Sequence, residues 1–202
     1  MAGKMVEIRW HGRGGQGAKT AAIFLAEAVL DRGKYSQGFP EYGPERRGAP
    51  MRGYTRIADE PIRRHCGIES PDIVIILDPT LLESAAAGVT AGSRDDTVYL
   101  VNTAEQPANI RRRLGLANGK VFTVDATQIA LDCFGRSIPN MPMIGALLAA
   151  TQLLPLDDMK SSLSERFRSS FCSGEFSTRV CSSFSVCFCL GNLSNEPFDI
   201  GF

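Results

Sequence analysis

The pattern of apolar and polar positions along the chain predicts strands that alternate with helices. Residues 5–10 alternate in polarity, which is typical of a β-strand, and residues 18–30 carry apolar side chains at helical spacing. Continuous apolar runs at 73–77 and 97–101 are typical of strands buried on both faces of a parallel sheet. Weaker patterns predict strands at 51–57 and 121–124 and helices at 80–87, 107–116, 126–133, 144–154 and 155–167. This order predicts an α/β fold, a three-layer sandwich around a mostly parallel, Rossmann-like sheet in a single domain.

One segment, residues 35–50, has too little periodicity for a regular element. It holds several Gly and Pro residues, together with aromatic and charged side chains that argue against simple disorder. Loops of this length in compact domains are usually functional. We therefore expect an ordered functional loop here.

A glycine-rich loop joins the first strand to the first helix. Gly12, Gly14 and Gly17 have the G-x-G-x-x-G spacing, which lets backbone N–H groups approach a phosphate at the positive end of a helix. The residues predicted to bind such a ligand are Gly12, Arg13, Gly14, Gly15, Gln16, Gly17 and Lys19. A purely structural tight turn is the alternative.

The glycine loop lacks the acidic partner of a dinucleotide site. Such a fold uses a carboxylate about 20 residues on to bind the ribose, but residues 33–38 contain none and Glu41 lies beyond them. This argues against a self-sufficient NAD-linked dehydrogenase and leaves other phosphate-bearing ligands open.

Few other residues suggest chemistry. Arg46 and Arg47, beside Glu45, suit an anion or partner contact, or form a solvated charge run. His11 either polarises a bound group or is structural. His65 next to Cys66 forms neither a dyad nor a metal site.

Composition excludes several classes of protein. The 202 residues include 22 Lys+Arg and 22 Asp+Glu, so the formal charge is zero, which argues against a broadly basic nucleic-acid binder. No apolar run reaches the ~18–20 residues needed to span a bilayer, and the first ten residues do not form a secretory signal. The spacing of the six cysteines fits neither an iron–sulfur cluster nor a zinc site. We expect a cytoplasmic protein that binds no metal, membrane or nucleic acid.

Four separated motifs then show a family resemblance. They occupy residues 7–20, 39–50, 70–79 and 139–146. Over about residues 5–167 the chain resembles gamma subunits of pyruvate:ferredoxin oxidoreductases (pyruvate synthases), within the 2-oxoacid:acceptor oxidoreductase gamma family.

The resemblance implies a subunit of a complex with alpha, beta and delta chains. Such complexes of anaerobic metabolism oxidatively decarboxylate pyruvate with CoA, form acetyl-CoA and CO2, and reduce ferredoxin. Thiamine diphosphate and the iron–sulfur clusters are then expected on the partner subunits, and a CoA contact is expected at the glycine loop. The residues expected at a subunit interface or active-site rim are Tyr42, Glu45, Arg46, Arg47 and Asn140. Other 2-oxoacids, such as 2-oxoisovalerate or 2-oxoglutarate, and a non-catalytic nucleotide- or CoA-binding module remain alternatives.

The last part of the chain, residues 168–202, differs from the rest. Four of the six Cys and many of the Phe and Ser residues crowd there without periodicity. This composition predicts a translated frameshift near residue 168, with a metal-binding or redox tail as the alternative.

Overall fold

A six-stranded sheet forms the centre of the fold, with strand order β2-β3-β1-β4-β5-β6. The computed structural model describes residues 5–41 and 48–169. The strands are β1 (Met5–Arg13), β2 (Tyr35–Glu41), β3 (Pro50–Ala58), β4 (Ile73–Ile76), β5 (Val98–Asn102) and β6 (Lys120–Val124). β3 runs antiparallel to both of its neighbours, whereas β1, β4, β5 and β6 pair in parallel. The expected mostly parallel sheet is confirmed.

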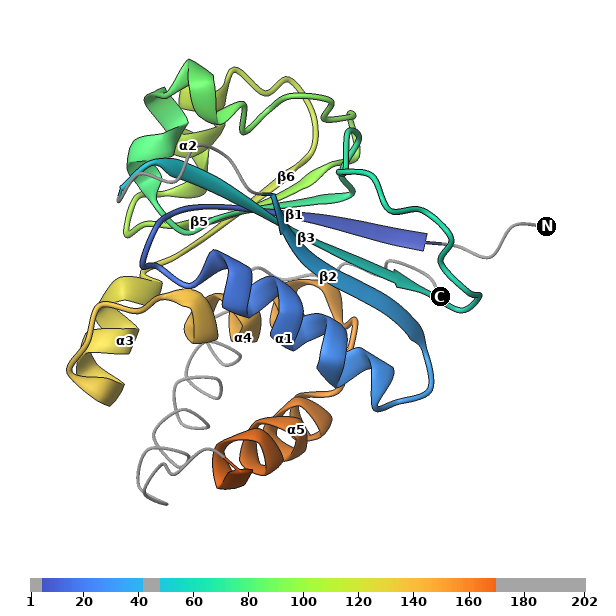
Figure 1. The fold of residues 1–202 in the computed structure, drawn as a ribbon. Coiled ribbons are helices and arrows are strands. Elements are labelled where there is room, and N and C mark those ends of the chain that lie inside the picture. Colours follow the sequence, from blue (N-terminus) through green and yellow to red (C-terminus); the bar gives the residue numbers. More distant parts are fainter. Residues whose placement is uncertain (1–4, 42–47, 170–202) are drawn as a thin grey trace.

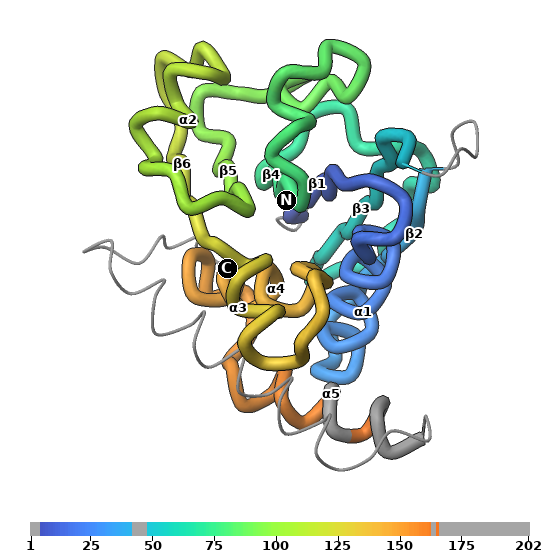
Figure 2. The backbone as a smooth tube through the Cα atoms, turned by 90° about the vertical axis from the view of Figure 1, so that its left-hand side faces the viewer, coloured from blue at the N-terminus to red at the C-terminus, as the bar shows by residue number. Residues whose placement is uncertain are grey.

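Helices cover both faces of the sheet, as expected for a three-layer sandwich (Figure 1). One face packs against α1 (Ala18–Leu30), α3 (Ala126–Phe134) and α4 (Asn140–Thr151), with α5 (Leu156–Ser169) outside them. The other face carries α2 (Pro107–Leu114) and the short 3-10 helices η1 (Pro79–Glu83) and η2 (Ala85–Ala87). Figure 2 shows the two layers on opposite sides of the curved sheet.

The buried strands divide the apolar core in two because their side chains alternate between the faces. Ile8 and Trp10 pack with α1 and α4 in the larger cluster, whereas Val74 and Ile76 face the smaller cluster beside α2. Every residue of α4 is buried. A helix that is apolar on all sides is expected inside a protein. The helix predicted at 144–154 is confirmed, although it begins at Asn140 rather than at residue 144.

Two sequence-based expectations about regular structure were wrong. Residues 35–41, expected to be part of an irregular loop, form the edge strand β2. Pairing with β3 overrides their low β-propensity, Pro40 is tolerated because β2 lies at an edge, and Gly38 lets α1 pack closely. Residues 80–87, expected to be one helix, form η1 and η2 because Ser84 between them is extended.

Several expectations concern residues outside the described part. Beyond Ser169 the atypical tail is not described, so its proposed origin remains a prediction. Within residues 5–41 and 48–169, no helix is long and apolar enough to cross a membrane.

Candidate functional site

The glycine loop is shorter in the structure than its motif suggests. Strand β1 continues through Gly12 to Arg13, so only residues 14–17 form the turn. Gln16 closes it, since its backbone N–H donates to the Arg13 carbonyl at 3.1 Å and its side-chain Oε1 accepts from the Arg13 N–H at 2.8 Å. Gly15 and Gly17 have positive φ angles of 99° and 81°. These conformations explain why glycine is needed at both positions.

The loop lies at the point where the sheet changes direction. From β1 the chain passes first to β2 and β3 on one side and then to β4, β5 and β6 on the other. In open α/β sheets, ligands bind at the carboxyl ends of the strands beside such a switch point. Asp78 follows β4 at the same edge, directly beside the loop.

Arg13 forms a polar network with the protein at this edge. Its Nη1 donates to the Gly48 carbonyl at 2.8 Å, and its Nη2 donates to Thr80 Oγ1 at 2.8 Å. Its Nε lies 3.2 Å from Asp78 Oδ2, which also accepts from Gln16 Nε2 at 2.8 Å. The guanidinium therefore binds the loop, the segment before β3 and the start of η1 together.

Asp78 is the acidic centre of this network and is 8% exposed. Burial alone would raise its pKa, but hydrogen bonds from the hydroxyl and N–H of Thr80 and from Gln16, with the charge of Arg13, lower the pKa overall. The carboxylate is thus ionised at neutral pH. Asp78 and Thr80 were not singled out from the sequence, although their place directly after a buried strand is a signal for this edge.

Asn140 reaches the same site from a distant part of the chain. It is 5% exposed and begins α4, and its side chain lies against Gly17 at the start of α1. The N-termini of two helices thus converge on the glycine loop, and both contribute positive potential there. The structure brings Asn140 and the loop together, as a shared site requires.

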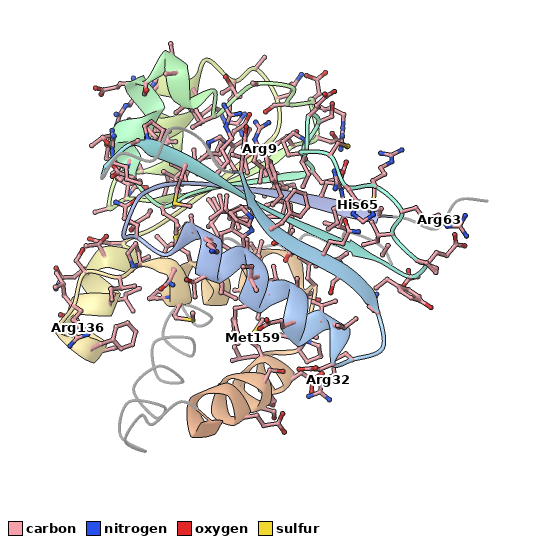
Figure 3. The ribbon with its side chains drawn as sticks, viewed as in Figure 1. Arg9, Arg32, Arg63, His65, Arg136 and Met159 are labelled. Carbon is pink, nitrogen blue, oxygen red and sulfur yellow. The ribbon has the colours of Figure 1, made fainter. Side chains whose placement is uncertain are left out.

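The remaining predicted residues separate into three groups. Lys19 is exposed on the first turn of α1 and has contacts of its own. Tyr42, Glu45, Arg46 and Arg47 lie outside the described residues. His65 and Cys66 are exposed in the loop after β3, at the opposite end of the sheet (Figure 3).

His11 is buried below the loop rather than presented to a ligand at its rim. It is 1% exposed, and its Nε2 accepts a hydrogen bond from Arg9 Nε at 3.0 Å. Burial, with the nearby charges of Arg9 and Arg52, lowers its pKa to about 3. A neutral imidazole with that pKa is a poor proton shuttle near neutral pH.

The described part of the chain contains no cluster of side chains suited to bind a metal ion. No group of three or more His, Cys, Asp or Glu side chains in residues 5–41 and 48–169 could hold a metal ion. The arrangement can instead hold an anionic group against backbone N–H groups, helix N-termini and an amide.

Comparison with known proteins relates this chain to one enzyme family. The family model for pyruvate ferredoxin/flavodoxin oxidoreductase matches residues 7–178. Pyruvate synthase subunit PorC of Thermotoga maritima is 48% identical over 171 residues, which are 85% of this chain and 87% of that protein. The pyruvate/ketoisovalerate oxidoreductases common subunit gamma of Thermococcus kodakarensis is 47% identical over 163 residues, covering 81% of this chain and 87% of that protein.

Solved structures are similar over nearly the whole chain. The crystal structure of pyruvate oxidoreductase subunit PORC from Thermotoga maritima has a TM-score of 0.80 and 43% identity, covering 92% of this chain and 96% of that one. A keto/oxoacid ferredoxin oxidoreductase gamma subunit from Geobacter sulfurreducens has a TM-score of 0.74 at 22% identity, covering 96% and 99%. The second likeness shows the shared fold.

Proposed function

This chain belongs to the pyruvate ferredoxin/flavodoxin oxidoreductase family, and on that premise we propose that it is the gamma subunit of a pyruvate synthase. The complex oxidatively decarboxylates pyruvate in the presence of CoA, forms acetyl-CoA and CO2, and passes the electrons to ferredoxin. The observation that carries this proposal is the family match across residues 7–178. The 48% identity to a pyruvate synthase subunit supports the choice of substrate.

The proposal assigns the redox cofactors to partner subunits. Alpha, beta and delta chains complete the complex, with thiamine diphosphate and iron–sulfur clusters bound there. The described residues offer no cluster-type set of cysteine ligands, because Cys66 and Cys133 are separate free thiols. Free thiols also agree with the cytoplasm as the proposed location.

Co-purification tests the assembly directly. A tagged copy of the full chain, expressed in its source cells, should purify with the other subunits and with CoA-dependent pyruvate oxidation. A stable monomer without associated chains would instead favour a non-catalytic nucleotide- or CoA-binding module.

The proposed role of the glycine loop is a contact to CoA. The phosphates of CoA suit backbone N–H groups at the start of α1, and Asn140 could donate an amide hydrogen bond beside Gly17. Lys19 adds an exposed positive charge on the first turn. Arg13 would act mainly by holding the loop in shape, since Asp78 and Thr80 already bind its guanidinium.

Lys19→Ala in the assembled complex tests this contact. Loss of the charge should raise the apparent KM for CoA several-fold and leave the KM for pyruvate unchanged. Lys34→Ala is the matched control, because Lys34 pairs with Asp59 beyond the other end of α1. Equal KM values for CoA in the two variants would contradict a contact at Lys19. Arg13→Ala should lower stability as well as CoA affinity.

A second 2-oxoacid is the alternative substrate. The Thermococcus kodakarensis relative is named as a subunit common to pyruvate and ketoisovalerate oxidoreductases. A gamma subunit of that kind would assemble with the other subunits of more than one oxidoreductase. Comparison of kcat/KM for pyruvate, 2-oxoisovalerate and 2-oxoglutarate with the purified complex decides between a dedicated and a shared subunit.

A further inference from the structure

The sheet face turned away from α1 carries an unusual row of charged side chains. Ile8 and Trp10 of β1 pack toward α1, so the alternate residues of β1 point to the other face. Three cross-strand rungs from β1, β3 and β2 lie there in register: Glu7–Arg56–Gln37, Arg9–Tyr54–Phe39 and His11–Arg52–Glu41. Figure 3 shows Arg9 on this side of the sheet, away from α1.

A cavity of about 190 Å³ lies at the third rung. His11, Arg52 and Glu41 line it from the sheet, and the start of β3 and the alanines of η2 line it from the sides. The cavity also lies near the carboxyl end of β1, but on the sheet face turned away from α1, whereas the glycine loop leads into α1 on the other face. Its polar lining comes from three different strands, so the fold itself positions these groups.

Arg9 places a positive charge beneath this cavity. It is 3% exposed, and its Nη2 donates to the carbonyls of Val89 at 3.1 Å and Ala91 at 2.7 Å. Within the described part of the chain, no ion pair is formed by Arg9. A buried guanidinium that is satisfied only by neutral acceptors favours a negative charge nearby.

His11 links that charge to the cavity. Because Arg9 is always a donor, the bond from Arg9 Nε to His11 Nε2 fixes Nε2 as the acceptor. The neutral imidazole then carries its proton on Nδ1. His11 lines the cavity and therefore offers a hydrogen-bond donor there, not a base.

Arg52 and Glu41 complete the charge balance. Arg52 Nη2 donates to the Ala87 carbonyl at 3.0 Å, and its Nη1 lies 3.5 Å from Glu41 Oε2. That same carboxylate oxygen accepts from the Tyr54 hydroxyl. Among the described residues around the cavity, the guanidiniums of Arg9 and Arg52 and the carboxylate of Glu41 sum to a single net positive charge. A monovalent anion neutralises this charge, whereas a divalent phosphate would leave an excess charge near Glu41.

We propose that this cavity is a binding site for a carboxylate group, held by Arg52 and the Nδ1–H of His11. The carboxylate belongs either to a small free acid or to an Asp or Glu side chain of an associated subunit. The first source is independent of the proposed function, and the second rests on it. A carboxylate from either source would bind in the same way, through a charge-assisted hydrogen bond from Arg52 and a second hydrogen bond from His11.

Histidine-selective NMR tests the free-acid source, because the chain has only two histidines. Acetate added to the isolated full chain at constant ionic strength should shift the His11 imidazole resonance saturably, with a millimolar Kd. The exposed His65 is the internal control and should not move. Phosphate at equal concentration should bind more weakly than acetate.

Variants distinguish a site from a general salt effect. Arg52→Gln should weaken acetate binding at least about tenfold, whereas Arg63→Gln, in the loop near His65, should not change it. Thermal melting identifies folded variants, and Arg52→Lys, which keeps the charge, replaces Arg52→Gln if the latter is unfolded. Because Arg52→Lys keeps the positive charge, it should weaken acetate binding by less than the roughly tenfold expected when the charge is lost.

Co-purification tests the associated-subunit source. If a partner's carboxylate fills the cavity, Arg52→Gln should lower the recovery of partner subunits at least about tenfold relative to Arg63→Gln. A wild-type chain that captures no subunits would count against the proposed function, and the acetate titration would then decide the site alone. The proposal is overturned if His11 and His65 shift equally, or if neither acetate binding nor subunit recovery depends on Arg52.

Discussion

The side chain of Asn140 lies in the space that a Cβ atom on Gly17 would occupy, with Asn140 Cγ only 2.8 Å from that position. Gly17 precedes α1 and Asn140 begins α4, although more than a hundred residues separate them. The glycine is therefore needed both for its positive φ angle and for the approach of α4.

Gly17→Ala should destabilise the protein by about 2–3 kcal/mol, because strain at φ 81° adds to the overlap with Asn140. Denaturant unfolding gives the free energy. Gly15→Ala is the matched control, since its φ is also positive at 99° but no atom of the described residues lies within 4 Å of its added Cβ. It should cost about 1 kcal/mol. The double variant Gly17→Ala/Asn140→Ala should cost less than the sum of the two single changes. Additive costs would exclude the overlap as a cause.

Asp78→Asn should lower the free energy of unfolding by about 2 kcal/mol at neutral pH, because Arg13 and Gln16 lose their charged partner. The pKa of Asp78 is lowered in the folded protein, so its stabilisation exists above the ordinary value of 3.8 and is lost as the pH falls through the folded pKa. The difference between the two proteins should therefore shrink from about pH 5 toward pH 3. Asp96→Asn, on an exposed side chain, should change stability by less than about 0.5 kcal/mol. A constant difference across this range would contradict the assignment.

His11 should make the protein less stable in mild acid. Its pKa is about 3 when folded and 6.5 in a free side chain, so the unfolded chain binds a proton in this window and the folded protein does not. Stability should therefore fall with decreasing pH below about 6.5, by up to roughly 1.4 kcal/mol per pH unit. His11→Gln keeps an acceptor for Arg9 and should show a shallower slope between pH 7 and 5. His65→Gln, in an exposed loop, should keep the wild-type slope; the same slope in all three proteins would refute the prediction.

Gly38→Ala should destabilise the packing of α1 on the sheet. An added Cβ would lie 2.6 Å from the Ala22 carbonyl oxygen and 2.7 Å from the Ile23 Cα, and backbone atoms cannot rotate away. We expect a loss of about 2 kcal/mol or more in urea unfolding. Gly14→Ala is the control, because among the described residues the only atom within 4 Å of its added Cβ is Gly48 N at 3.6 Å. A loss in Gly14→Ala as large as in Gly38→Ala would show that side-chain space is not the cause.

The strongest parts of the sequence pattern predicted the fold well. The apolar runs at 73–77 and 97–101 became β4 and β5 because both faces of these strands are covered. The helix predicted at 126–133 is also present as α3, and Asp125 caps it by accepting from the Gln128 N–H at 2.9 Å. Strand β2 was missed because its stability comes from pairing with β3 and from contact with α1, which local composition does not record.

The site was only partly predictable. The spacing of Gly12, Gly14 and Gly17 placed the loop between strand and helix, as observed. The sequence could not show that Arg13 binds Asp78, because the two residues meet only when β1 and β4 pair. The same holds for His11 and Arg52, whose contact depends on the register of β1 with β3.

The central place of β1 has a consequence for the order of folding. Trp10 donates to Thr55, 45 residues further on, and the Glu7 N–H donates to Asp72, 65 residues further on. β1 is synthesised before both of its partners, so it stays unpaired until β3 and β4 have been made, and closing loops of this length is entropically costly. During synthesis β1 therefore waits with both edges unpaired, and a chaperone that binds exposed strands would protect it until its partners have been made.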